Sequence, residues 1–79
     1  MTQLLIQTTA PDFTAWKSTF DAKAEDIDSA GLNTLQIWTA DGSRVLVLFE
    51  VVNRKRAEDW LAKESALGHP LSPLFLETA

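Results

Sequence analysis

Cysteine is missing from this 79-residue chain, and histidine occurs once, as His69. Without cysteine there is no disulfide, no thiolate nucleophile and no cysteine metal ligand, which fits a reducing compartment. One histidine cannot build a histidine metal cluster, so a metal site would need carboxylates, and we expect neither metal nor cofactor. Small domains without disulfides or metals commonly gain buried area by self-association. We therefore expect an oligomer.

Long apolar runs and a surplus of basic residues are also missing. No run approaches the roughly 18–20 apolar residues that span a bilayer. Met1 leads directly into a strand-like segment, without the basic and apolar regions of a signal peptide. The formal charge is −4, with 11 acidic and 7 basic residues, whereas nucleic-acid binding depends on neutralising phosphates. We expect one cytoplasmic domain, residues 1–79, with no nucleic-acid or membrane partner.

Residues 34–52 predict a β-hairpin, because Asp41-Gly42 separates two runs rich in β-branched and aromatic residues. A two-residue turn at Asp41-Gly42 sets a register that sorts the strand residues into two faces. The expected pairs are Ala40 with Ser43, Trp38 with Val45, Gln36 with Val47, and Thr34 with Phe49. The aliphatic face, assigned to the helices, holds Leu4, Ile6, Leu35, Ile37, Leu46 and Leu48. The mixed face, left for a partner chain, holds Leu5, Gln7, Gln36, Trp38, Val45, Val47, Phe49 and Val51.

The remaining elements follow from apolar spacing and from helix start and stop signals. Alternation predicts a strand over residues 2–9, and residues 74–78 are long enough for one edge strand. Apolar residues at spacings of three and four predict a helix that Pro11-Asp12 opens and Gly31 ends. That stripe is Phe13, Trp16, Phe20, Ala24 and Ile27. Asn53 is the expected N-cap of a second helix, which runs from Arg54 to about Leu67.

The order is β-α-β-β-α-β, which predicts an α+β, ferredoxin-like domain. Because β-α-β crossovers are right-handed in nearly all known cases, both helices should cover one face of a four-stranded antiparallel sheet. The helices can cover only that face. The other face, which holds Trp38, Val47 and Phe49, is expected to pack against a second copy of the chain.

Several packing motifs spread over most of the chain resemble one known family. These motifs are Asp12-Phe13-x-x-Trp16-Lys17-x-x-Phe20-Asp21, Ala30-Gly31-Leu32, the strand Val45 to Val51, and Ala57-x-x-Trp60. The chain resembles the dimeric α+β barrel superfamily, and within it the antibiotic biosynthesis monooxygenase-like proteins. The resemblance implies a homodimer whose two sheets pack face to face, with a cavity between sheet and helices in each protomer. Members include cofactor-free oxygenases, haem-degrading, dechlorinating and isomerising enzymes, and many without known activity.

The motifs describe packing and carry little chemistry. The chain has no tyrosine, and Gly68-His69-Pro70 matches no catalytic motif. The candidate catalytic residues are His69, as the one side chain that titrates near neutral pH, and Asn33, as a donor to a substrate carbonyl. The candidate ligand-binding residues are Trp38, Gln36, Gln7, Phe49 and Trp60. Each has a structural alternative, such as a dimer contact, a core position or a surface loop.

Two functional hypotheses stay open at this stage. In the first, the chain is a cofactor-independent oxygenase that holds a small aromatic or polyketide-like molecule in a dry cavity. A substrate that loses a proton readily can then react with oxygen without metal or flavin. In the second, the chain is a non-catalytic dimer that binds a small apolar ligand or another protein. The sequence does not decide between the two.

Overall fold

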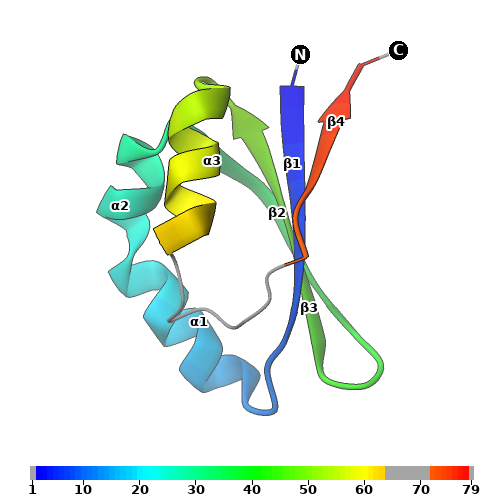
Figure 1. The fold of residues 1–79 in the computed structure, drawn as a ribbon. Coiled ribbons are helices and arrows are strands. Elements are labelled where there is room, and N and C mark those ends of the chain that lie inside the picture. The colour runs from blue at the N-terminus through cyan, green and yellow to red at the C-terminus, as the bar shows by residue number, and fades with distance from the viewer. Residues whose placement is uncertain (1, 64–71, 79) are drawn as a thin grey trace.

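The computed structural model describes residues 2–63 and 72–78 and shows an α+β fold (Figure 1). Helices lie on one side of a four-stranded sheet, in which each neighbouring pair of strands is antiparallel and the order is β2-β3-β1-β4. The strands are β1 (Thr2–Thr9), β2 (Leu32–Ala40), β3 (Arg44–Val51) and β4 (Leu74–Glu77). The helices are α1 (Phe13–Ala22), α2 (Ala24–Ser29) and α3 (Arg54–Lys63). The predicted strands, including the last edge strand, are confirmed.

The predicted register of the hairpin is wrong over most of its length. The turn contains three residues, Asp41 to Ser43, so Trp38 pairs with Leu46 instead of Val45. Gly42 and Ser43 both have positive φ, at 78° and 60°. A bulge at Leu35 takes up the one-residue shift, so only the pair at the start of the hairpin, Thr34 with Phe49, agrees with the prediction.

This one-residue shift reverses the two faces of β3, because neighbouring strand residues point to opposite sides. Val47 and Phe49 have no exposed surface and lie under the helices, whereas Leu46 and Leu48 are half-buried on the other side. For β1 the predicted faces are correct: Leu4 and Ile6 belong to the fully buried core, and Leu5 and Gln7 lie on the side without helices.

The predicted signals at Asn53 and Gly31 are confirmed, whereas the first helix begins at Phe13 and not at Pro11. Asp12 is the N-cap of α1, where its carboxylate accepts from the backbone N–H of Ala15 at 3.1 Å. Asn53 caps α3 in the same way through the N–H of Arg56, also at 3.1 Å. Gly31 ends α2 with φ of 74°, and a Cβ there would lie 3.0 Å from the backbone nitrogen of Asn53. Gly31 therefore meets two needs, a left-handed conformation and a close approach.

The first helix differs from the prediction because it divides at Lys23. The N–H of Lys23 bonds to the carbonyl of Phe20 at 3.1 Å, the tighter spacing of a helix end, and α2 restarts with Ile27 bonding back to Lys23. The break turns Ala24 out to solvent, although Ile27 stays buried. The predicted apolar stripe is therefore wrong at Ala24. The predicted end of the second helix, at Leu67, lies outside the described residues.

Phe49 occupies the centre of the core. Its ring stacks on Phe20 of α1, with 6.2 Å between centroids, and meets the edge of Trp60 of α3 at 6.1 Å. Trp16 continues the line, stacked on Phe20 at 5.2 Å. Aromatic pairs with this geometry add stability beyond their buried area. One fully buried ring of β3 therefore contacts both α1 and α3.

Truncation of Phe49 should cost far more stability than the same change at the exposed end of the aromatic line. We expect Phe49→Ala to lower the free energy of unfolding by about 3–5 kcal/mol, because it leaves a cavity that the sheet cannot close. Phe13 is 37% exposed, so Phe13→Ala should cost less than half as much. Urea unfolding at one fixed protein concentration measures both, and equal losses would contradict the central role of Phe49.

The turn provides a test of the register. Ser43→Gly should raise the free energy of unfolding by about 0.5–1 kcal/mol, because glycine adopts positive φ without the steric cost that Ser43 bears. Asp41→Gly is the matched control and should destabilise, because positive φ occurs at Gly42 and Ser43 and not at Asp41. The opposite ranking of the two variants in thermal unfolding would indicate the two-residue turn.

Candidate functional site

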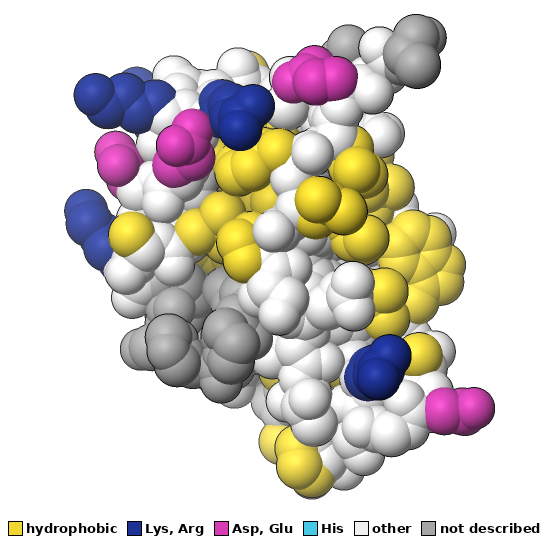
Figure 2. Space-filling view, turned by 45° about the vertical axis from the view of Figure 1, so that its right-hand side comes forward, with side chains coloured by type: hydrophobic (Ala, Val, Ile, Leu, Met, Phe, Trp, Pro, Cys, Tyr) yellow, Lys and Arg dark blue, Asp and Glu magenta, His cyan; other side chains and the backbone are white. Residues whose placement is uncertain are grey.

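The sheet has an open face, on the side away from the helices, with a continuous apolar patch. Direct cross-strand partners share a face, so the strand pairing gives the rows of this open sheet face. From β4 or β1 towards β2, the rows are Leu76, Gln3, Glu50 and Asn33; then Leu74, Leu5, Leu48 and Gln36; then Gln7, Leu46 and Trp38. Trp38 and Leu74 are 43% and 53% exposed. Figure 2, turned towards this side of the molecule, shows hydrophobic side chains gathered between charged groups at the upper and lower ends.

Three of the predicted ligand-binding residues, Trp38, Gln36 and Gln7, lie on the open sheet face. Gln36 donates from Nε2 to the carbonyl of Ile37 at 3.3 Å. The candidate catalytic residue Asn33 lies on the same face and donates from Nδ2 to a carboxylate oxygen of Glu50 at 3.2 Å. Asn33 also borders a groove of about 290 Å³ beside α2. The structure thus places these polar side chains along one face of the sheet.

The assignment of Val47 and Phe49 to the partner face is wrong. Both side chains are fully buried beneath the helices, because the three-residue turn changes which residues of β3 point outwards. Leu46 and Leu48 take their places on the open sheet face. The other catalytic candidate, His69, lies outside the described residues. Within residues 2–63 and 72–78, no group of three or more acidic or histidine side chains could hold a metal ion.

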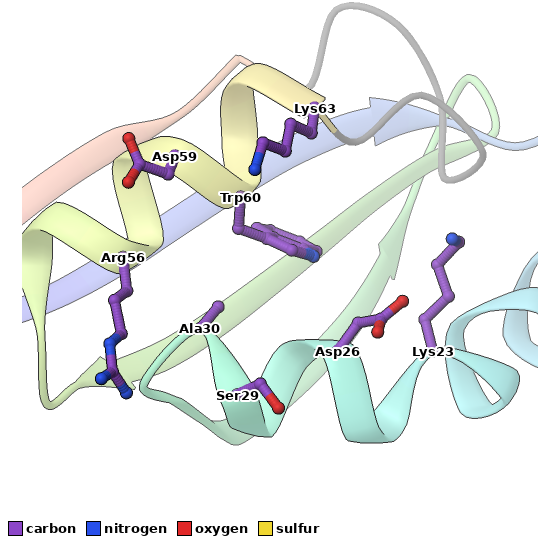
Figure 3. A pocket seen from close by; sticks show the side chains of 8 residues that line it. All are labelled: Lys23, Asp26, Ser29, Ala30, Arg56, Asp59, Trp60 and Lys63. Atoms are coloured by element: carbon purple, nitrogen blue, oxygen red, sulfur yellow. The ribbon is translucent and has the colours of Figure 1, made fainter.

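A second surface feature lies on the helical side, in a groove of about 440 Å³ between α2 and α3 (Figure 3). Its basic residues are Lys23, Arg56 and Lys63, and its acidic residues are Asp26 and Asp59. Figure 3 shows Asp59 extending from α3 away from the space between the two helices. The groove therefore carries an excess of positive charge, although the whole chain carries −4.

Trp60 forms the apolar wall of this groove. Its ring extends from α3 into the space between α3 and α2, and its nitrogen end is turned to the side where Lys23 and Asp26 lie (Figure 3). Only 8% of the residue is exposed. Within the described part of the chain, its Nε1 is a buried donor without a hydrogen-bond partner. A buried N–H without an acceptor is rare in folded proteins.

The sequence indicated Trp60 as a candidate ligand-binding residue but gave no indication of the arrangement of charged residues around it. The available signal was the basic triplet Arg54-Lys55-Arg56 in the first turn of α3, where the helix dipole disfavours cations. Arg54 pairs with Glu58 at 3.3 Å, and its guanidinium lies 4.3 Å from the ring centre of Phe75. Arg56 borders the groove. The contact with Phe75 of β4 thus accounts for Arg54, whereas no such contact accounts for Arg56 in the described part of the chain.

Comparisons of the chain with protein-family models, curated proteins and solved structures find no match. Of the helices that the structure describes, none has the length and apolar character needed to cross a membrane.

The lone donor of Trp60 should be dispensable for stability in the absence of a ligand. Trp60→Phe keeps an aromatic ring against Phe49 and removes the buried N–H, which costs about 1–3 kcal/mol when it is unpaired. We expect the free energy of unfolding to fall by less than 1.5 kcal/mol. Trp60→Ala is the control and should cost about 3–5 kcal/mol. If urea unfolding shows that Trp60→Phe and Trp60→Ala lower the free energy of unfolding equally, the N–H is itself a stabilising group.

Proposed function

We propose that this chain is a ferredoxin-like domain that works as a homodimer and binds small molecules or other proteins without catalysis. Its open sheet face packs against the same face of a second copy, as in a dimeric α+β barrel. The observation that carries this proposal is the apolar patch of Leu5, Leu46, Leu48 and Trp38 on a sheet whose other face is covered by helices. Large apolar patches on small proteins commonly mark interaction sites.

The charges on β3 favour a second copy of this chain as the occupant. Arg44 and Glu50 lie on the open sheet face at opposite ends of β3, with Leu46 and Leu48 between them. A two-fold axis across the strands would bring Arg44 of each protomer to Glu50 of the other, and the leucines together in the middle. An isologous interface requires such a self-complementary surface.

A binding role accounts for the placement of the polar residues better than catalysis does. The oxygenase hypothesis requires polar groups that converge on a substrate in a dry cavity. Asn33 and Gln36 instead form hydrogen bonds within their own chain. The side chain of Phe49 is completely buried in the core. In the proposed dimer, Trp38, Gln36 and Gln7 serve as contacts between the sheets. We propose a cytoplasmic setting, in keeping with the absence of cysteine.

Light scattering at several dilutions tests the dimer directly. We expect a mass of about 17.6 kDa, twice the 8.8 kDa of the chain. Leu48→Asp places two carboxylates in the apolar centre of the interface, so it should weaken the dimer at least tenfold. Ser18→Asp, an exposed position on α1, is the control and should leave the mass unchanged. A wild-type chain that stays at 8.8 kDa at every concentration would refute the proposal.

A charge exchange tests the arrangement of the two copies. Arg44→Glu and Glu50→Arg each bring like charges together, so each should weaken the dimer about threefold to tenfold at low salt. The double variant should restore most of the affinity, because it rebuilds the pair with its charges reversed. Sedimentation equilibrium measures the dissociation constants. Additive losses in the double variant would show that Arg44 and Glu50 do not meet across the two-fold axis.

A further inference from the structure

We propose that the groove between α2 and α3 is a binding site for a small organic carboxylate, with Nε1 of Trp60 as the donor to a carboxylate oxygen. This site lies on the helical side of the molecule. It is thus separate from the open sheet face, and its test does not depend on the dimer.

The unpartnered donor is the first argument. Trp60 is more than nine-tenths buried, and its Nε1 has no hydrogen-bond partner within the described residues. Its ring enters the groove that it lines (Figure 3). An indole N–H can only donate, so a ligand that satisfies it must present an acceptor atom. A neutral or charged oxygen meets this requirement, and an amine does not.

The charge of the groove selects an anionic acceptor. Arg56 and Lys63 of α3 both line the groove, and of its two acidic lining residues Asp59 extends away from the space between the helices (Figure 3). Hydrogen bonds between ionised partners are about twice as strong as neutral ones, so a carboxylate gains more here than an amide or alcohol does. Asp26 lies on the nitrogen side of the indole ring (Figure 3). Its charge opposes an anion and limits the affinity.

The size and apolar wall of the groove favour an organic anion over an inorganic one. A volume of about 440 Å³ lies within the roughly 300–1,000 Å³ that is usual for small-molecule sites. The indole ring of Trp60 and the methyl group of Ala30 supply apolar surface for the body of such a ligand. Inorganic phosphate would meet the cations but would leave this apolar surface without a contact.

Nuclear magnetic resonance of the indole N–H groups tests the site with defined probes. The chain has three tryptophans, and Trp60→Phe identifies the signal of Trp60. We expect benzoate to shift that signal downfield in a saturable way at millimolar concentration. Benzamide, of the same shape without the charge, and inorganic phosphate should each bind at least fivefold more weakly. No saturable shift with benzoate, or equal binding of benzamide or phosphate, would overturn the proposal.

Exposed side chains provide variants that leave the core intact. Asp26→Asn should tighten benzoate binding about threefold, because it removes the opposing charge, whereas Arg56→Gln with Lys63→Gln should weaken it at least fivefold. Lys55→Gln is the matched control, since Lys55 lies on the same helix but does not line the groove, and it should leave the affinity unchanged. If Lys55→Gln weakens benzoate binding as much as Arg56→Gln with Lys63→Gln does, the loss arises from the overall charge of the protein and the proposed site is wrong. Light scattering on the same samples reports the dimer separately.

Discussion

The contact of Phe49 with the two helices α1 and α3 is the interaction on which the rest of the structure depends. Phe49 is fully buried on a central strand, with Phe20 of α1 on one side and Trp60 of α3 on the other. A chain of 79 residues buries a smaller share of its surface than a large domain does, so each such contact carries more weight. The position of Trp60 against Phe49 also fixes the wall of the groove between α2 and α3.

Phe49 faces the helices because the hairpin turn has three residues. With a two-residue turn, Leu46 and Leu48 would point towards the helices, and the larger ring of Phe49 would lie outside. Gly42 and Ser43 adopt positive φ to make the longer turn, and the bulge at Leu35 returns β2 to its original phase. The turn therefore decides which apolar residues form the core and which form the open sheet face.

The patterns that are local in sequence were predictable, and the features that depend on distant contacts were not. Asp12, Asn53 and Gly31 act through neighbouring backbone groups, so their residue types indicated where α1 and α3 start and where α2 ends, but not the break at Lys23. The faces of β3 were assigned wrongly because the assignment rested on a two-residue turn, although Arg44 and Glu50, in phase with Leu46 and Leu48, marked the outer side. The Asp-Gly pair indicated a turn but did not fix its length.

The groove was harder to predict because its two sides come from segments about thirty residues apart, Lys23 to Ala30 and Arg56 to Lys63. No single stretch of sequence contains the arrangement of charges. The first turn of α3 carries basic residues, although the helix dipole disfavours cations there. Natural sequences tolerate such unfavourable placements mainly where tertiary contacts or function compensate for them. For Arg54, the contact with the ring of Phe75 and the ion pair with Glu58 compensate for this placement. The positive charge of Arg56 and the N–H of Trp60, which has no partner among residues 2–63 and 72–78, meet at one groove, and a single anionic ligand would compensate both.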